Sequence, residues 1–288
     1  MRPVHPRAVL APTIPRCRVT GSVVTGGVGR EAIEAAVARL DRAAVEHVPC
    51  APVADLIGPS DIDAAYAVQS ALTALRVARG ARVVGRKIGL TSPAVQRQVG
   101  VDRPDFGVLF DDMSYASGAT VPFGRLLQPR AEAEIAFILA ADIVDPQPAA
   151  VRAAVGSAVA AIEVVDSRVA DWRIRITDTV ADNASSGVFV LGDRHLTLDE
   201  FTPADVSMRM LRNGVTASTG TGRACLGDPL SALAWLARTA LDFGDPLRGG
   251  DIVLSGALGP LAPIEPGDVI QAEVGPLGPV TATFEKEG

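Results

Sequence analysis

Three glutamates stand in apolar segments of the chain, where an ionised carboxylate is costly to bury. Glu132 and Glu134 lie two residues apart in the run Gln128–Phe137, and Glu163 lies within the run Ala158–Val165. Residues i and i+2 of a strand project to the same face, so Glu132 and Glu134 are expected to point the same way. Buried unpaired carboxylates are unfavourable, and neighbouring like charges repel. A hard divalent cation, Mg²⁺ or Mn²⁺, is the simplest common partner and leaves positions open for water and substrate.

Two simpler interpretations of these glutamates stay open at this point. A Glu-x-Glu pair on a strand is commonly the solvated face of an alternating strand, and Glu163 alone is more often an ion-paired core residue. Arg130 and Arg168 are cations that could pair with the carboxylates. Because three carboxylates stand in apolar runs, a metal site is as good an interpretation as these simpler ones.

One lysine is also a candidate for chemistry. The chain carries 27 basic residues, but only Lys87 and Lys286 are lysines. Lys286 lies in the charged C-terminal tail, whereas Lys87 lies in the strand-like run Val83–Thr91. A lysine is a compact charge with a tunable pKa, which makes an interior Lys87 a candidate site residue. The alternative is a strand-end lysine whose ammonium reaches solvent.

Composition limits the class of protein. The 288 residues are 48% hydrophobic with a net charge of −6, which suits a globular protein and argues against nucleic acid as a partner. Charges and glycines interrupt every apolar run before it reaches membrane-spanning length. Cys17, Cys50 and Cys225 are few, odd in number and without CxxC spacing. We therefore expect no disulfide framework, no thiolate zinc site and a cytoplasmic location.

The pattern of elements predicts an α+β fold. Residues 1–27 read as a disordered tail or an extension, and residues 28–80 as a helical N-terminal subdomain with helices near 29–46 and 60–79, the second capped by Ser60. Residues 81–288 read as a β-rich catalytic domain that carries the metal site, with one helix near 229–243. The expected strands are 82–88, 131–140, 158–166, 187–191, 206–213, 251–254, 268–274 and 279–285.

Several polar or glycine-rich segments exclude other chemistries. His5, His47 and His195 are all far in sequence from the carboxylates, so a Ser-His-Asp triad is not expected. The segments 218–223 and 255–259 fail the phosphate-loop and dinucleotide fingerprints, and both read as turns where the backbone approaches a ligand or a strand. The segment 182–187 offers hydroxyls and an amide, which also suit a simple turn.

Taken together, the motifs identify a resemblance. The chain resembles the 2-keto-4-pentenoate (2-hydroxypenta-2,4-dienoate) hydratases of aromatic-ring catabolism, within the fumarylacetoacetate hydrolase superfamily, over roughly residues 28–285. The stretches that carry the resemblance are Gly85–Thr91, Pro104–Gly107, Leu127–Glu134, Ala161–Arg168, Asp171–Trp172, Asp178–Gly187, Cys225–Leu230, Gly250–Leu254 and Gly256–Pro260.

The resemblance implies a C-terminal β-sandwich or roll and a divalent metal held by three carboxylates, at the positions of Glu132, Glu134 and Glu163. It also implies a homo-oligomer, a pentamer or decamer, that can associate with a pathway aldolase or decarboxylase. The implied substrate is a 2-hydroxy-2,4-dienoate, which would be converted through its 2-oxo-3-enoate tautomer to a 4-hydroxy-2-oxo acid.

Proton transfer in such a reaction needs a positioned acid and base. We expect Lys87 and Asp105 to serve, with Glu134 or a metal-bound water as competitors. The expected substrate contacts are Ser185, Ser186, the backbone at Gly256 and Leu258, and Arg86.

Related activities are alternatives. A 4-oxalocrotonate decarboxylase shares the metal and the motif around Asn183, but we expect it to carry an Asn-Phe-Lys-Phe-like stretch where this chain has Asp171-Trp172 and Asp178-Thr179. The hydrolase branch needs a His–Glu pair, which the histidine positions do not favour. A tautomerase or isomerase and a non-catalytic partner subunit are less favoured possibilities.

Overall fold

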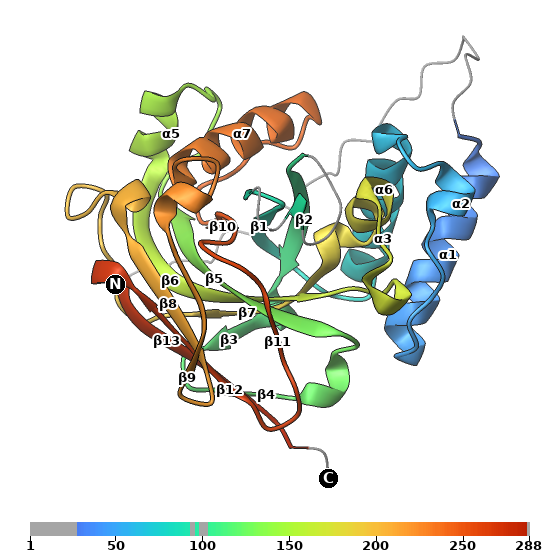
Figure 1. The fold of residues 1–288 in the computed structure, drawn as a ribbon. Coiled ribbons are helices and arrows are strands. Elements are labelled where there is room, and N and C mark those ends of the chain that lie inside the picture. The colour runs from blue at the N-terminus through green and yellow to red at the C-terminus, as the bar shows by residue number, and fades with distance from the viewer. Residues whose placement is uncertain (1–27, 93–95, 98–102, 287–288) are drawn as a thin grey trace, which may run out of the picture.

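The computed structural model describes residues 28–92, 96–97 and 103–286. Figure 1 shows a group of helices on one side of a strongly curved β-structure, with two further helices at its upper end. The predicted α+β class with a helical N-terminal part is confirmed. The prediction for residues 1–27 lies outside the described residues. The predicted division at residue 80 falls in the connection between the last N-terminal helix and the first strand, and the division into a subdomain and a catalytic domain stays a prediction.

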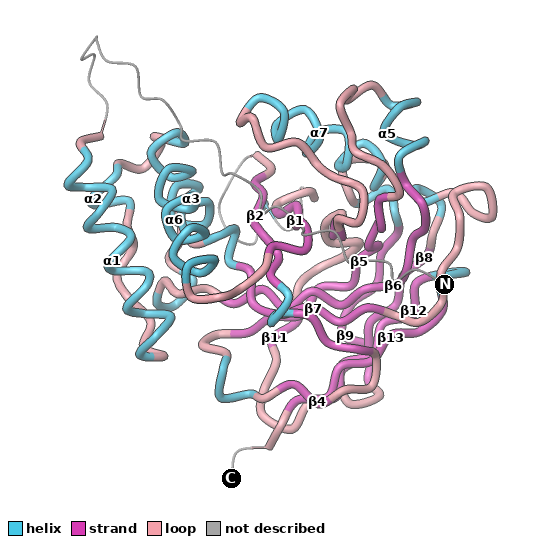
Figure 2. The backbone as a smooth tube through the Cα atoms, turned by 180° about the vertical axis from the view of Figure 1, so that it is seen from behind, coloured by secondary structure: helices cyan, strands magenta, loops and turns pink. Residues whose placement is uncertain are grey.

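Three helices open the described chain: α1 (Arg30–Glu46), α2 (Ala54–Ile57) and α3 (Ile62–Ala78). The cap of α3 is Asp61, whose carboxylate accepts a hydrogen bond from the N–H of Ala64 at 3.0 Å, so the prediction of Ser60 was one residue early. A helix from much later in the chain, α6 (Ile176–Ala181), packs against α3, as Figures 1 and 2 show. The sequence pattern does not reveal α6 because only six residues form it.

A buried carboxylate joins α6 to the N-terminal helices. Asp178 Oδ1 accepts hydrogen bonds from the N–H groups of Val53 and Ala54, at 2.7 and 2.9 Å. These are unsatisfied donors at the start of α2, where a negative charge is favourable. The Gln69 side-chain amide donates to the carbonyls of Phe106 and Val180, which adds a second polar tie. The helical group is thereby fixed to the β-rich part of the molecule.

Two sheets form the rest of the core. The larger sheet has the order β2-β1-β10-β5-β6-β7-β3, with β11 paired to β5, and the smaller has the order β4-β13-β12-β8-β9. The strands of the larger sheet are β1 (Val83–Gly89), β2 (Asp105–Phe110), β3 (Ser114–Ala116), β5 (Pro129–Leu139), β6 (Val155–Asp166), β7 (Ser186–Leu191), β10 (Ile252–Leu254) and β11 (Ala262–Pro263). Those of the smaller are β4 (Thr120–Val121), β8 (Ser207–Arg212), β9 (Val215–Thr221), β12 (Val269–Val274) and β13 (Gly278–Phe284).

The two sheets pack face to face. Alternate residues of β5 share one buried cluster with the inner residues of the smaller sheet: Ala131, Ala133, Ile135 and Phe137 meet Met208, Ile270, Ala272, Val280 and Ala282. This arrangement is the predicted β-sandwich. Helices α5 (Pro148–Ala154) and α7 (Pro229–Asp242) pack against each other at one end of it (Figure 1).

All eight predicted strands are present, but five short or polar strands were missed. The segment 218–223, expected as a turn, begins within β9. Its glycine is explained by a close approach, because a Cβ on Gly220 would lie 1.8 Å from the carbonyl oxygen of Leu258. Across the described part of the chain, the helices are all too short or too polar to cross a membrane.

Candidate metal centre and active site

The three glutamates meet on one face of the larger sheet. β5 carries Glu132 and Glu134, and antiparallel β6 places Glu163 directly opposite Glu132. One carboxylate oxygen from each lies within 4.8 Å of those of the other two. Their relative exposures are 5%, 0% and 2%, so water cannot screen their mutual repulsion. The sequence argument from alternation is therefore correct, and the solvated-face interpretation is wrong.

The oxygens of this cluster fit a hard cation. Glu134 Oε2 accepts a hydrogen bond from the N–H of Gly256 at 2.8 Å. Among the described residues, Glu134 Oε1 and Glu163 Oε2 have no hydrogen-bond partner, and the contact of Glu163 Oε1 is an ion pair with Lys87. Buried polar atoms are rarely left without partners, so each needs an explanation. Three carboxylates with free lone pairs in a common space match the oxygen ligands that Mg²⁺, Mn²⁺ or Ca²⁺ prefers.

Lys87 is buried within this cluster. Its side chain is 2% exposed, and its Nζ lies 3.0 Å from Glu163 Oε1 and 3.1 Å from the carbonyl oxygen of Ala184. Burial alone would lower the pKa of Lys87, but the charges of Glu163, Asp105 and the other glutamates outweigh it and raise that pKa. Lys87 is therefore an interior residue paired with Glu163, and the solvent-reaching alternative is excluded.

Sheet curvature is what brings Lys87 to Glu163. β10 and β5 separate β1 from β6, so a flat sheet would place the two backbones about 14 Å apart. The registers Lys87↔Leu254 and Leu254↔Ala136 put Lys87 on the face that carries the glutamates. Ion-pair contact across that distance requires the sheet to curl around this face.

Asp105 begins β2 beside Lys87. It is 1% exposed; its Oδ2 accepts a hydrogen bond from the Thr179 hydroxyl at 2.9 Å, and its Oδ1 has no partner among the described residues. Burial raises the pKa of Asp105, while Lys87 and the Thr179 hydrogen bond oppose that rise. Gly89 makes room for this carboxyl, because a Cβ there would lie 2.1 Å from Asp105 Oδ1 and 3.2 Å from Lys87 Nζ.

Replacing Gly89 by Ala should therefore disturb catalysis more than folding. The added methyl displaces the Asp105 carboxyl, and a displacement of this kind is expected to lower kcat by about 10- to 100-fold. Steady-state kinetics with circular dichroism measure the two effects. Gly124→Ala is the matched control, because a Cβ at Gly124 meets nothing within 4 Å. Wild-type turnover in Gly89→Ala would show that the position of Asp105 is unimportant.

The pKa values of the glutamates predict how metal binding depends on pH. Burial, followed by repulsion from Glu163, raises the pKa of Glu132 to about 8, and burial with the same repulsion raises that of Glu134 well above its ordinary value. Because the ionised carboxylates bind the metal, divalent-cation affinity should rise between pH 6 and about 8, with release of protons. Calorimetry in buffers of different ionisation enthalpy counts those protons; a pH-independent affinity would contradict the prediction.

The same raised pKa of Glu132 affects the stability of the metal-free protein. Between the unfolded pKa of 4.5 and about 8, the folded state holds a proton on Glu132 that the unfolded state has lost. The metal-free protein should therefore lose stability as the pH rises through this window. A bound divalent cation should remove that loss, since it replaces the proton as the partner of the carboxylates.

A left-handed turn at residues 183–185 provides the carbonyl group that accepts a hydrogen bond from Lys87. Asn183, Ala184 and Ser185 have φ values of 56°, 50° and 51°, an uncommon conformation for residues other than glycine. The Asn183 side chain exchanges two hydrogen bonds with the backbone of Val108, at 2.7 and 2.9 Å. These bonds hold the turn in the conformation in which the carbonyl of Ala184 faces Lys87.

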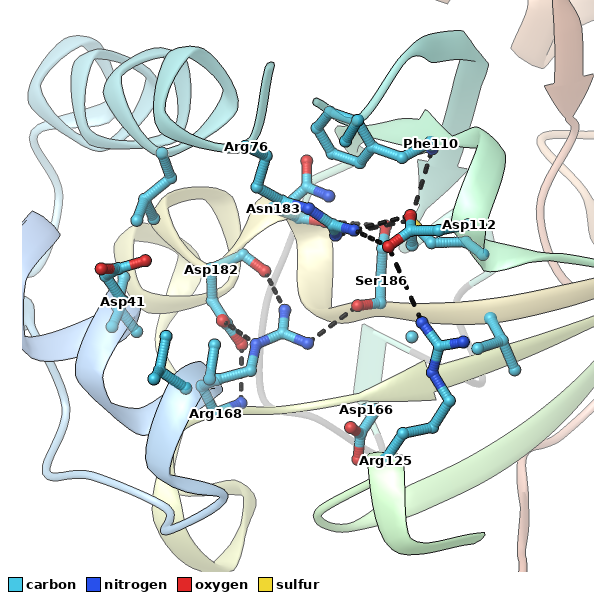
Figure 3. Close-up of a pocket in the computed structure, with 18 of the residues that line it drawn as sticks. Asp41, Arg76, Phe110, Asp112, Arg125, Asp166, Arg168, Asp182, Asn183 and Ser186 are labelled. Carbon is cyan, nitrogen blue, oxygen red and sulfur yellow. Dashed lines mark hydrogen bonds and ion pairs between the residues drawn. The ribbon is translucent and has the colours of Figure 1, made fainter. Parts of the chain in front are cut away.

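Arg168 holds the two ends of this turn. Its guanidinium donates to the Asp182 carboxylate at 2.5 Å and to the carbonyls of Asp182 and Ser186 at 2.6 and 2.8 Å (Figure 3). Arg168 therefore pairs with Asp182, not with the glutamates, which the sequence left as a possibility. The Ser185 hydroxyl lies 3.4 Å from Asp182, and the Ser186 hydroxyl donates to Asn183 O at 2.9 Å. The predicted role of both serines in substrate binding stays a prediction.

The other predicted substrate contacts have partners within the protein. The N–H of Leu258 donates to Ala133 O at 3.0 Å, and that of Gly256 to Glu134. Arg86 points to the opposite face from Lys87 and forms an ion pair with Asp245. Arg86 would have to leave Asp245 to meet a substrate on the glutamate face. All three roles stay predictions.

Two further side chains of the site were not proposed from the sequence. Thr179 lies within a motif that the resemblance used, but its contact with Asp105 follows from the position of α6. Asn183 also lies in a quoted motif, and its amide was noted with a simple turn as the alternative, but no role was assigned to it. The described histidines lie elsewhere: His47 ends α1, and His195 contacts Ser157 at 3.0 Å.

A pocket of about 750 Å³ lies on the far side of the left-handed turn, between the N-terminal helices and the sheet (Figure 3). Arg76, Arg125, Arg168 and Asp182 are among its lining residues, whereas the three glutamates, Lys87 and Asp105 are not. Arg76 pairs with Asp112, and Arg168 with Asp182. This pocket is therefore distinct from the candidate metal centre.

Comparison with known proteins fits this geometry. The fumarylacetoacetate (FAA) hydrolase C-terminal family matches residues 82–285. The chain is 49% identical over 254 residues to a 2-keto-4-pentenoate hydratase of Paraburkholderia xenovorans strain LB400, covering 88% of this chain and 94% of the relative. It is 43% identical over 238 residues to a 2-hydroxyhexa-2,4-dienoate hydratase of Comamonas testosteroni, covering 81% and 90%.

A solved structure gives the same result for the fold. The 4-oxalocrotonate decarboxylase of Pseudomonas putida G7, complexed with magnesium and adipate, superposes with a TM-score of 0.84 at 33% identity, covering 89% of this chain and 98% of that one. The residues that the family matches, 82–285, include the three glutamates, Lys87 and Asp105. The chain belongs to the fumarylacetoacetate hydrolase family and is about 49% identical, over 88% of its length, to 2-keto-4-pentenoate hydratases.

Proposed function

We propose that this protein is a metal-dependent hydro-lyase that hydrates a 2-hydroxy-2,4-dienoate, through its 2-oxo-3-enoate tautomer, to a 4-hydroxy-2-oxo acid in aromatic catabolism. The observation that carries the proposal is the set of five buried ionisable groups on one sheet face: Lys87, Asp105, Glu132, Glu134 and Glu163. The 49% identity to 2-keto-4-pentenoate hydratases supports the substrate class.

Glu132, Glu134 and Glu163 would hold Mg²⁺ or Mn²⁺. When bound, the metal supplies a Lewis acid for the 2-oxo group and carboxylate of the substrate. The N–H of Gly256 keeps Glu134 Oε2 oriented, which leaves Oε1 toward the common space. Lys87 neutralises part of the excess negative charge and keeps Glu163 in place.

Asp105 serves the proton transfers, and Lys87 serves the negative charge that develops during them. In the first half-reaction the 2-hydroxyl loses a proton and C5 gains one, which gives the unsaturated 2-oxo acid. In the second, the oxygen of water bonds to C4, and one of its protons is added at C3. Asp105 is suited to accept and return these protons, because its Oδ1 is unpartnered and burial raises its pKa. The charged Lys87 stabilises negative charge that develops on the substrate oxygens.

A 4-oxalocrotonate decarboxylase is the second candidate, because a decarboxylase of that type has the same fold at a TM-score of 0.84. Both reactions pass through the same kind of enolate, and the glutamate cluster serves either. The Asp171-Trp172 and Asp178-Thr179 segments favour the hydratase. A tautomerase would share only the first half-reaction, and a non-catalytic subunit would show no turnover.

The deciding experiment supplies purified protein and Mg²⁺ or Mn²⁺ with freshly generated 2-hydroxypenta-2,4-dienoate, followed by ultraviolet decay and product NMR. Metal-dependent formation of 4-hydroxy-2-oxopentanoate is expected. Carbon dioxide release from 4-oxalocrotonate without hydration would assign the chain to the decarboxylases. Formation of 2-oxopent-3-enoate alone would indicate a tautomerase.

Assembly and location complete the proposal. The protein forms a homo-oligomer, a pentamer or decamer, in the cytoplasm, and can associate with a pathway aldolase or decarboxylase. Light scattering coupled to size exclusion gives the number of subunits directly.

A further inference from the structure

Arg130 continues the row of side chains that forms the metal centre. It precedes Glu132 by two residues on β5, so it projects from the same face. Its partner across the sheet is Val165, which follows Glu163 by two residues on β6. The guanidinium therefore belongs to the sheet face that carries the glutamates, one step beyond them along both strands.

Arg130 differs from two other arginines near the site, because its guanidinium is not paired with a carboxylate among the described residues. Arg86 pairs with Asp245 and Arg168 with Asp182. Among the described residues, the Arg130 side chain has neither an ion pair nor a hydrogen bond; its guanidinium carbon lies 4.4 Å from the centre of the Trp172 ring. Arginine stays charged at all physiological pH values, so a partly buried guanidinium with five free donors is suited to an anion.

The backbone holds Trp172 in an unusual conformation beneath that guanidinium. Asp171 and Trp172 have φ values of 58° and 53°, which is costly for a bulky residue such as Trp. The indole N–H donates to the carbonyl of Gln128 at 3.1 Å, and Asp171 N–H donates to the Gln128 side chain at 2.7 Å. Gln128 thus fixes the ring in place, so the position of the stacked Arg130 is also defined.

An apolar cluster adjoins both this pair and the metal centre. Leu90, Val165, Ala257 and Leu261 form it, with Trp172 packed against them. Leu90 follows Gly89, which contacts Asp105 and Lys87, and Ala257 follows Gly256, which donates to Glu134. These apolar side chains therefore lie next to Arg130, which is paired with Val165, and next to residues that adjoin the metal centre.

We propose that Arg130, stacked on Trp172, is a substrate-binding residue that holds a carboxylate of the substrate. The proposal rests on the proposed function in taking a 2-oxo acid as the ligand. Two carboxylates of such ligands share this chemistry: the one at C1 beside the 2-oxo group, and one at the far end of a dicarboxylate. A planar guanidinium binds either through paired N–H donors.

The test measures binding of two unreactive ligands of equal chain length, so that it does not depend on turnover. Isothermal titration of the Mg²⁺-loaded protein with 2-oxohexanoate and with 2-oxoadipate gives both affinities. In Arg130→Met, loss of a bidentate charged contact should weaken at least one of them by about tenfold or more. Equal weakening of both identifies the C1 carboxylate; weakening of 2-oxoadipate alone identifies the far one.

The controls separate binding from folding. Arg209→Met removes an exposed arginine that pairs with Glu273 on the other sheet and should leave both affinities within about twofold. If Arg130→Met does not fold, Arg130→Lys, which keeps the charge but loses the planar fork, should weaken binding by about threefold or more. Unchanged affinity for both ligands in a folded Arg130 variant would overturn the proposal. Failure of hydration with intact ligand binding would instead overturn the proposed function alone.

Discussion

Replacing Glu132 by Gln is expected to remove metal-dependent stabilisation and activity, yet to make the metal-free protein more stable. Glu132 lies opposite Glu163, and its buried carboxylate is repelled by that neighbour. A neutral amide of equal size relieves the repulsion without leaving a cavity. A tenfold change in proton affinity corresponds to about 1.4 kcal/mol, so the gain in stability at pH 8 and above should be on the order of 1 kcal/mol or more.

Glu132→Gln should raise the stability of the metal-free protein and lower the stabilisation by metal. These opposite changes can be distinguished in one experiment. Thermal unfolding with and without Mg²⁺ or Mn²⁺ should show a higher midpoint than wild type without metal and a smaller rise on adding it. Glu273→Gln is the matched control, since Glu273 pairs with Arg209 at the surface and should change neither. Normal metal affinity in Glu132→Gln would remove Glu132 from the ligand set.

Replacing Lys87 by Met should lower turnover by about 10²- to 10³-fold, the range for loss of one group that stabilises developing negative charge, without loss of metal binding. The Lys87 ammonium lies 3.0 Å from Glu163 and competes with a divalent cation for the same carboxylate. Without that competition, affinity for Mg²⁺ should be equal to or higher than that of wild type. An inactive variant with intact metal binding would separate the role of Lys87 from that of the glutamates.

Lys286→Met provides the matched control, because Lys286 is the other lysine of the chain and lies in the C-terminal tail. It should match wild type in kcat and in metal affinity. Two results would count against the role given to Lys87: wild-type turnover in Lys87→Met, or parallel loss of metal affinity and activity. The second would mean that Lys87 acts only by keeping Glu163 in position.

The local sequence pattern was sufficient to predict an element where that element buries a regularly spaced set of side chains. The strands that carry Glu132, Glu134, Glu163 and Lys87 were all predicted, because alternation and apolar runs depend only on neighbouring residues. β2 was missed because it is short, begins with the charged Asp105 and has a glycine within its apolar run. The segment at Gly220 was wrongly taken for a turn, but the close approach of another backbone that was expected there is present at Leu258.

The pairing of charges could not be read from the chain. From the sequence, Arg130 and Arg168 were equally plausible partners for the glutamates. In the structure Arg168 forms an ion pair with Asp182, and Arg130 stacks on Trp172. Arg86 and Lys87 are adjacent in sequence, yet one faces Asp245 and the other Glu163. Such choices depend on which strands become neighbours, and segments far apart in the chain settle them.

The sequence by itself determined the types and spacing of the carboxylates, the α+β class, and the absence of the histidine, cysteine and glycine patterns of other chemistries. Only the tertiary structure decided that Lys87 meets Glu163 and that Thr179 holds Asp105. The physical reason is that alternation is a property of one strand. Contact between β1 and β6 requires the register and curvature of a whole sheet, together with a helix docked behind it.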